Sequence, residues 1–283
     1  MMQFPISPAQ PLLLFTDLDG TLIDHHTYSA AGALEALHLL AGHRVPVVFC
    51  SSKTFAEQIF LQKQLGLHQP FIVENGSAVA VPNGYFVSKP INFLKPYKVA
   101  DDYELFSLSH TDAAAIRAEL AHFQNIKSFS DASDAELSAA TGLAGEALQR
   151  ARDRQFTETL LTPLDAEQVV FLKKKLAAKG LALSRGGRFH TVLSAQADKG
   201  KAVQWLAKVF GENLPVAPFT AAVGDSPNDA PMLAAVDFPF LVQKHDGSWA
   251  EVEVPGLIKM EGIGPAGFSA AVRLLLGEKP TRP

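Results

Sequence analysis

Short continuous apolar runs recur along this chain and are separated by longer segments of mixed polarity. Runs at 12–16, 45–50 and 71–73 predict buried strands, because a strand covered on both faces needs no polar alternation. Similar runs return late in the chain, at 219–223 and 238–242. Strands that alternate with helical segments predict an α/β fold with a doubly wound, Rossmann-like parallel sheet.

The segments between these runs carry helix start and stop signals. Ser29 is expected to cap a first helix, and Thr54 with Glu57 forms a capping box for a second. Gly66 is expected to end that second helix, since glycine adopts left-handed backbone angles without strain. Further helices are expected over 200–210 and 266–275.

The middle of the chain has a different character. From about residue 111 to residue 193 the strands are shorter, and Gly186-Gly187 predicts a hairpin turn. A strand over 103–108 is expected to form an edge just before this region. The sequence therefore predicts an α+β domain over 111–192, inserted between two parts of a core domain at 1–110 and 193–283.

Composition narrows the class of partners. The chain of 283 residues is 47% hydrophobic and carries a net charge of −4, so nucleic acid is not expected as the main partner. No apolar run reaches the ~18 residues of a membrane span, and the N-terminus lacks the features of a signal peptide, so no membrane association is expected and the predicted location is cytoplasmic. The single cysteine, Cys50, allows no intramolecular disulfide.

The first apolar run ends in the sequence DLDGT, which places Asp17 and Asp19 just past a strand. Two carboxylates at this spacing suit phosphate chemistry, because one can attack phosphorus while the other moves a proton. Asp-Gly is also an ordinary turn pair. Other strand ends must therefore supply a cation, a metal ligand and phosphate donors.

Two later segments offer the phosphate donors and the cation. Ser51 directly follows the second strand and is the favoured phosphate ligand, whereas Ser52 is as well suited to cap a helix. Lys53 follows them. Lys199 stands at the start of a predicted helix, where a cation is unfavourable to the helix dipole, so an anionic neighbour is expected.

A further segment, GDSPND, offers the metal ligands. Asp225 and Asp229 follow the strand at 219–223, and parallel strands bring their carboxyl ends to one edge of a sheet. Carboxylates gathered there with Asp17 would repel one another without a cation. Mg²⁺ fits, because it prefers oxygen ligands and leaves positions for substrate phosphate.

These four segments, in this order, resemble the signature motifs of the haloacid dehalogenase superfamily. The insertion resembles the C2-type cap of its Cof-like subclass, and the resemblance covers the whole chain. It implies a Mg²⁺-dependent phosphatase that forms an aspartyl-phosphate. The residues to which it assigns roles are Asp17 as nucleophile, Asp19 as acid and base, Ser51 and Lys199 on the phosphoryl group, and Asp17, Asp19, Asp225 and Asp229 on the metal.

A finer resemblance, to the mannosyl-3-phosphoglycerate phosphatase family, includes the segments 24–29, 74–76, 154–158 and 186–190. It implies a small phosphorylated sugar-glycerate as substrate. That family usually has an acidic residue at the position of Gln155. The residues expected to bind the substrate are Ser52, Lys53, Glu74, Asn75, Arg154, Glu158, Gly187 and Arg188.

The sequence leaves several alternatives open. Arg154 and Glu158 would serve as well in a surface ion pair, and His25 and His26 are expected to pack in their loop rather than to bind metal. The substrate could instead be a glucosyl-3-phosphoglycerate or another sugar phosphate. A phosphosugar mutase or a catalytically inactive binding protein is a more distant alternative, and the oligomeric state is left open.

Overall fold

A computed structural model of the chain describes residues 10–87, 98–100, 102–109 and 111–278. Its internal contacts form two compact units. The first unit comprises residues 1–51, 84–93 and 199–283, and the second comprises residues 52–83 and 94–198. The domain boundaries expected from the sequence stay a prediction, because compact contact units need not coincide with domains.

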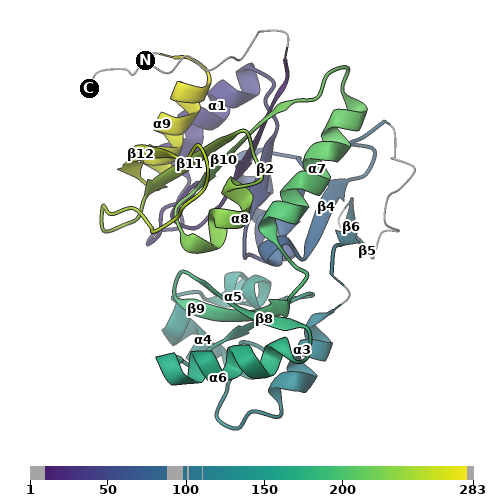
Figure 1. Cartoon of the computed structure of the whole chain (residues 1–283), viewed down its shortest axis with the longest axis vertical. Coiled ribbons are helices and arrows are strands. Elements are labelled where there is room, and N and C mark those ends of the chain that lie inside the picture. The colour runs from purple at the N-terminus through teal and green to yellow at the C-terminus, as the bar shows by residue number, and fades with distance from the viewer. Residues whose placement is uncertain (1–9, 88–97, 101, 110, 279–283) are drawn as a thin grey trace. The chain divides into compact units, whose positions relative to one another are not determined.

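The first unit is built on five parallel strands in the order β12-β11-β10-β1-β2 (Figure 1). Their bounds are β1 Leu12–Thr16, β2 Val47–Cys50, β10 Phe219–Gly224, β11 Phe238–Gln243 and β12 Ile258–Ile263. All five residues of β1 are buried, as expected of a central strand covered on both faces. The loops that follow β1, β2, β10 and β11 therefore leave from one edge of this sheet.

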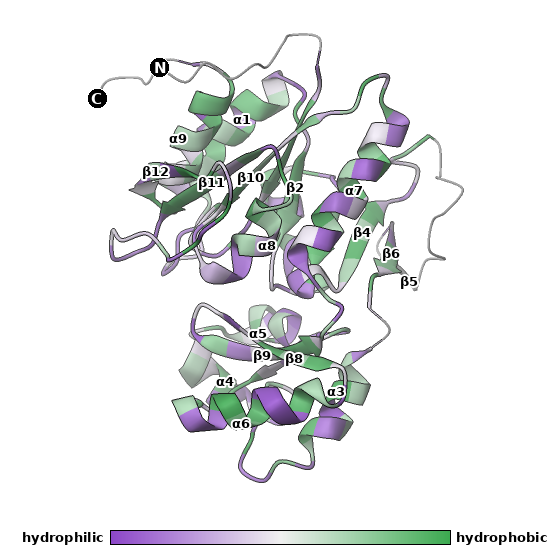
Figure 2. Cartoon of the chain, in the orientation of Figure 1, coloured by the Kyte–Doolittle hydropathy of each residue, from purple (hydrophilic) through white to green (hydrophobic). Residues whose placement is uncertain are grey.

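Helices cover both faces of these strands. They are α1 Leu34–Gly42, α7 Lys199–Asn213, α8 Ala230–Leu233 and α9 Pro265–Leu275, with 3₁₀ turns at Ala31–Ala33 and Pro227–Asp229. Helix α9 contacts α1 and β12, while α8 contacts α7 and β10. Figure 2 shows the strands as mostly hydrophobic and the helices as mixed, which matches one buried and one exposed helix face.

The second unit contains four antiparallel strands in the order β3-β4-β6-β5. Their bounds are β3 Phe71–Val73, β4 Ala78–Pro82, β5 Lys98–Ala100 and β6 Tyr103–Ser107. Helix α2, Phe55–Leu65, begins at the predicted capping box, because Thr54 accepts from Glu57 N–H and the Glu57 side chain accepts from Thr54 N–H. It ends at Gly66, whose φ is 65°.

A second, three-stranded antiparallel sheet in the same unit has the order β7-β9-β8. Its strands are β7 Glu158–Leu160, β8 Leu181–Gly186 and β9 Phe189–Ser194. The helices of this part are α3 Ala113–Leu120, α4 Asp134–Thr141, α5 Gly145–Arg152 and α6 Ala166–Ala177. Ile116, Leu172 and Val192 lie in a hydrophobic cluster between α3, α6 and this sheet.

The fold class expected from the sequence is confirmed by this architecture, but three strand features differ. The strands β4, β5 and β12 were not predicted. The strand at 103–107 was expected at an edge, yet β6 lies between β4 and β5. The strands after β3 run antiparallel because the chain reverses within the tight turn Glu74–Gly76, rather than through a crossover helix.

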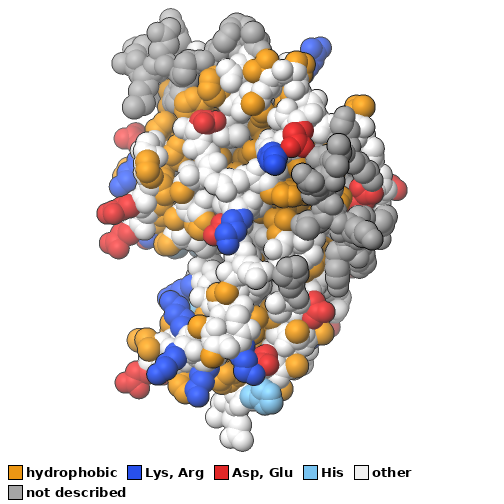
Figure 3. Space-filling view, turned by 45° about the vertical axis from the view of Figure 1, so that its right-hand side comes forward, with side chains coloured by type: hydrophobic (Ala, Val, Ile, Leu, Met, Phe, Trp, Pro, Cys, Tyr) orange, Lys and Arg blue, Asp and Glu red, His pale blue; other side chains and the backbone are white. Residues whose placement is uncertain are grey.

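The surface and the helices bear on the kind of partner. On the face drawn in Figure 3, acidic and basic side chains are interspersed among apolar and uncharged ones. Of the helices in the described ranges, none is both long enough and apolar enough to cross a bilayer.

Candidate active site

Asp17 directly follows β1, and its backbone N–H donates to Val223 O of β10 at 2.9 Å. The chain then turns at Gly20, which has a φ of 81°. A Cβ atom at Gly20 would lie 2.7 Å from Asp225 Oδ2. Thr21 Oγ1 donates to Asp225 Oδ1 at 3.2 Å. Glycine at position 20 therefore permits the close approach of two loops, and Thr21 holds them together.

The loop after β10 is folded around Asp229. The Oδ2 atom of Asp229 accepts from the backbone N–H groups of Asp225 and Ser226, both at 3.1 Å. A Cβ atom at Gly224 would meet Asp229 Cβ at 2.7 Å, so this glycine also admits a close contact. Asp229 is fully buried, and one of its oxygens serves to hold the loop that carries Asp225.

Lys199 is the first residue of α7 and is only 2% exposed. Its Nζ donates to Asp17 Oδ1 at 2.8 Å and to Asp229 Oδ1 at 2.7 Å. The anionic neighbours expected of a cation at a helix start are therefore these two carboxylates. Lys199 links the loop after β1 to the loop after β10.

Burial controls the electrostatics of this cluster. Burial raises the pKa of Asp17 to about 7, and the charges of Asp229 and Asp19 add to this rise while Lys199 opposes it. Burial, with the charges of Asp229 and Asp17, also raises the pKa of Asp225 well above its usual value. For Lys199, burial opposes the charged form, but Asp17 and Asp229 outweigh it and raise the pKa.

The residues present fit a divalent cation. Asp17, Asp225 and Asp229 each offer a carboxylate oxygen, and these oxygens all lie within 4.8 Å of one another. When all are ionised, three carboxylates and one ammonium leave two negative charges in a buried place, which a divalent ion would neutralise. An all-oxygen donor set of this kind suits Mg²⁺ better than it suits softer metals.

The other core residues named from the sequence lie close in the chain to strand ends. Ser51 is buried directly after β2, at the same edge of the parallel strands as Asp17. Ser52 contributes its carbonyl oxygen to Arg154. The Lys53 ammonium lies 3.5 Å from Glu57 Oε1, one turn into α2. For Ser52 and Lys53 the structure thus shows contacts within the protein, and their binding of substrate stays a prediction.

Glu74 and Asn75 lie in a left-handed turn between β3 and β4. Their φ angles are 48° and 61°, an uncommon conformation for residues other than glycine. The buried Glu74 carboxylate accepts from Gln155 N–H at 2.9 Å, Phe156 N–H at 3.1 Å and Thr157 Oγ1 at 2.7 Å. Burial nevertheless raises the pKa of Glu74 against these donors. Glu74 thus anchors the segment that leads into β7.

Arg154 and Glu158 flank that anchored segment and have different partners. Arg154 Nη1 donates to Ser52 O at 3.2 Å and to Thr157 Oγ1 at 2.8 Å. Glu158, only 1% exposed, accepts from Arg117 at 3.2 Å and from Ser130 N–H at 3.2 Å. Glu158 therefore pairs with Arg117 in this structure, and the role of either residue towards substrate stays a prediction.

Arg188 lies in the hairpin turn between β8 and β9, after Gly187, whose φ is 55°. Its guanidinium donates to the carbonyls of Ala140 at 3.3 Å and Thr141 at 3.1 Å, at the last turn of α4. The guanidinium carbon lies 5.5 Å from the centre of the Phe189 ring. Arg188 is thus placed by α4 and Phe189, and its predicted contact with substrate remains untested.

Two contributors to these sites had not been singled out as site residues. Thr21 binds Asp225, and its position in the DGT sequence was the available signal. Thr157 bridges Glu74 and Arg154, and nothing near it in the sequence points to a partner 83 residues away.

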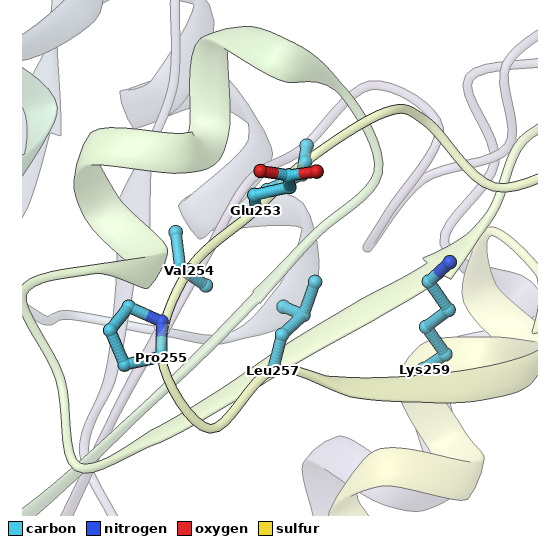
Figure 4. Close-up of a pocket in the computed structure, with 6 residues that line it drawn as sticks. Glu253, Val254, Pro255, Leu257 and Lys259 are labelled. Atoms are coloured by element: carbon cyan, nitrogen blue, oxygen red, sulfur yellow. The ribbon is translucent and has the colours of Figure 1, made fainter.

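A separate surface pocket lies in the connection between β11 and β12 and at the start of β12 (Figure 4). Its walls are mostly apolar, with Glu253 and Lys259 as charged residues. It contains none of the carboxylates of the cluster around Asp17. The pocket therefore contributes nothing to the chemistry of that cluster.

The family of haloacid dehalogenase-like hydrolases matches residues 14–246, and the chain belongs to this family. Two relatives match over 94% of the chain, and both are glucosyl-3-phosphoglycerate/mannosyl-3-phosphoglycerate phosphatases. The relative from Persephonella marina is 35% identical and matches over 98% of its own length. The relative from Methanococcoides burtonii is 37% identical and matches over 97% of its own length.

Solved structures support the fold. The sucrose-phosphatase from Synechocystis, solved in complex with sucrose and phosphate, has a TM-score of 0.62 at 16% identity, covering 95% of this chain and 98% of that one. At this identity the likeness concerns the fold alone. The family match and the two relatives confirm the predictions of a haloacid dehalogenase-like protein and of a phosphatase.

Proposed function

We propose that the protein is a Mg²⁺-dependent phosphatase that acts on a sugar 3-phosphoglycerate, the substrate class named for its two relatives. The observation that carries the chemistry is the buried cluster of Asp17, Asp225, Asp229 and Lys199. The observation that carries the substrate class is the match to relatives over 94% of the chain.

The first step is the transfer of the phosphoryl group to Asp17. A carboxylate oxygen of Asp17 bonds to phosphorus while the ester P–O bond breaks, and Asp19 donates a proton to the departing alkoxide. In the second step Asp19 takes a proton from water, the water oxygen bonds to phosphorus, and the Asp17–phosphate bond breaks. Lys199 and Ser51 offset negative charge on the phosphoryl oxygens.

The metal would be held by Asp17, Asp225 and the backbone at Asp19. When bound, it supplies charge neutralisation for the carboxylates and the phosphoryl group. Asp229 acts mainly by positioning, since its oxygens already hold Lys199 and the Asp225 loop.

Substrate choice is assigned to the second unit. Arg154 and Arg188 offer guanidinium groups suited to a glycerate carboxylate, and Asn75 offers an amide suited to sugar hydroxyls. Mannosyl-3-phosphoglycerate is the first choice, and glucosyl-3-phosphoglycerate is the second candidate because both names are joined in the relatives. A cytoplasmic location fits these small anionic substrates.

The experiment is a panel of phosphate esters assayed with Mg²⁺ and with EDTA. The panel contains the mannosyl and glucosyl phosphoglycerates, 3-phosphoglycerate, a hexose phosphate and p-nitrophenyl phosphate. We expect kcat/KM for one of the sugar phosphoglycerates to exceed that for the hexose phosphate by about 100-fold or more, which corresponds to a few kcal/mol of differential binding. Equal kcat/KM values across the panel would contradict the substrate assignment but would still be consistent with a phosphatase.

A mutase is separated from a phosphatase by the fate of the phosphoenzyme. The substrate is labelled isotopically in its phosphoryl group, and unlabelled sugar is added. For a phosphatase we expect the label to appear in inorganic phosphate. Label on the added sugar would instead identify a phosphosugar mutase, and absence of turnover on every ester would favour an inactive binding protein.

A further inference from the structure

Three histidines from two separate loops lie together in the first unit. His25 and His26 belong to the loop after β1, and His245 belongs to the loop after β11. The ring centres are 4.6 Å apart for His25 and His245, 5.0 Å for His25 and His26, and 5.4 Å for His26 and His245. The phosphatase chemistry uses none of these side chains.

Local hydrogen bonds shape both loops. Asp24 Oδ1 accepts from the backbone N–H groups of His26 at 3.0 Å and Thr27 at 2.8 Å, which fixes the turn that carries two of the imidazoles. In the other loop, Lys244 N–H donates to Ser248 O at 2.8 Å and closes a tight turn around His245. The three rings are therefore presented by preformed backbone.

The spacing of the rings matches that of a metal site. In a tetrahedral zinc site with Zn–N bonds of about 2.0–2.1 Å, the centres of the ligating imidazoles lie about 5 Å apart. The three measured separations bracket this value. The rings also pack on one another, since His25 and His245 are stacked with an interplanar angle of 9° and His26 meets both of them edge-on.

The rings need a turn about χ2 before all three can bind one ion. Among the residues that the structure describes, the only group of three whose ligand atoms all lie within 4.8 Å is the aspartate cluster. Rotation about χ2 turns an imidazole about an axis close to its ring centre, so it redirects the nitrogens while the spacing of the centres is nearly kept. One nitrogen of each ring suffices, so the other can retain a hydrogen bond.

Exposure and charge favour a cation over an anion. His26 and His245 are exposed and His25 is half-buried, which leaves an entry path for an ion. The loop segments 24–29 and 244–248 contain two negatively charged residues, Asp24 and Asp246, and one positively charged residue, Lys244. Lys244 lies 3.5 Å from Asp246. The local balance is negative, so phosphate is disfavoured.

We propose that His25, His26 and His245 form a binding site for a first-row transition-metal ion, with Zn²⁺ as the best fit. The site is separate from the carboxylate cluster, which offers oxygen ligands only. Imidazole nitrogen selects Zn²⁺, Ni²⁺ or Cu²⁺ over Mg²⁺. A bound ion would tie the loop after β1 to the loop after β11.

The test is a calorimetric titration of the full-length protein with Zn²⁺ alone, in the presence of saturating Mg²⁺. We expect one Zn²⁺ per chain and a higher melting temperature with zinc. His245→Ala and His26→Ala are each expected to weaken binding by at least about 10-fold, a lower bound taken from losses seen when only an outer partner of a ligand is removed. Binding is also expected to weaken as the pH falls, because protonated imidazole does not bind metal.

Two controls separate this site from others. His43→Ala removes an exposed histidine of the same unit and should leave zinc affinity unchanged. Asp225→Asn alters the carboxylate cluster and should also leave the zinc site intact. If His245→Ala changes the zinc-free melting temperature, His26→Ala from the other loop carries the test. Absence of zinc binding, loss of it in Asp225→Asn, or an equal loss in His43→Ala would each overturn the proposal.

Discussion

Two of the places where the protein buries carboxylates hold them in different ways. The Glu74 carboxylate, in the second unit, receives two backbone N–H groups and one hydroxyl. In the first unit Asp17, Asp225 and Asp229 face one another, and burial together with their mutual charge raises the pKa values of Asp17 and Asp225. Burial raises the pKa of Glu74 as well, but its donors and the charge of Arg154 oppose that rise, whereas neighbouring aspartates add to the rise at Asp17 and Asp225. Carboxylates crowded in this way suit an exchangeable cation. We infer that the surroundings of Glu74 serve structure, whereas the cluster of Asp17, Asp225 and Asp229 serves chemistry.

Asp17→Asn is the substitution in the aspartate cluster from which we expect the largest effect. The amide keeps the shape of the side chain but cannot act as the nucleophile, so we expect kcat/KM to fall by at least about 1,000-fold. The measurement is phosphate release with Mg²⁺ on the preferred substrate. Hydrolysis at the normal rate, with Mg²⁺ still bound, would exclude Asp17 as the nucleophile.

Lys199→Met removes the cation that pairs with Asp17 and Asp229. We expect activity to fall by about 100- to 1,000-fold, the loss typical of one electrostatic contact to the reacting group. Unfolding free energy should also fall by about 3–5 kcal/mol, since two buried carboxylates lose their partner. Lys201→Met, at an exposed position of the same helix, is the matched control and should change neither quantity. Normal activity in Lys199→Met would contradict the role of this lysine.

Metal removal should make stability depend on pH. The folded-state pKa of Asp17 is raised from 3.8 to about 7, so between these values the folded protein binds protons that the unfolded chain has released. Without metal, unfolding free energy therefore falls as the pH rises from about 4 to about 7. Added Mg²⁺ should raise the melting temperature most at the upper end of this window. An equal effect of Mg²⁺ at both ends would argue against carboxylate ligands.

Glu74→Gln tests the other carboxylate and should have the smallest effect. The amide NH₂ group would face donors, so at least one hydrogen bond is lost and unfolding free energy should fall by about 1–3 kcal/mol. Mg²⁺ affinity should be unchanged. Glu146→Gln, at a side chain that is 92% exposed, is the control. A loss of metal affinity in Glu74→Gln would erase the distinction between the two places.

Local signals allowed much of the fold to be predicted. The capping box at Thr54 and the stop at Gly66 are written into adjacent residues, and both were predicted correctly. The parallel strands of the first unit follow from continuous apolar runs. Strand β4 was missed because its five residues follow the Glu74–Gly76 turn, which was interpreted as a motif and not as a reversal of the chain.

The candidate sites show the same limit. Asp17, Lys199 and Asp225 could be named because each directly follows a strand or begins a helix, and parallel strands bring such positions to one edge. The partners of Glu74 could not be named, since its carboxylate binds residues 81 to 83 positions further along the chain. Contacts of this kind depend on tertiary structure and leave no local pattern. The histidine cluster could not be predicted for the same reason, because His245 lies in the loop after β11, far along the chain from His25 and His26.

The contact between Asp17 and Lys199 joins residues 182 positions apart, and the whole second unit lies between them. On a ribosome that adds about 5–20 residues per second, Asp17 emerges roughly 10–40 s before its counter-charge. Strand β1 also cannot complete its hydrogen-bonded pairing until β10, its neighbour in the sheet, has been synthesised. A nascent chain can thus complete the interior of its second unit before Asp17 meets Lys199, so the proposed active site is assembled late in the protein's own synthesis.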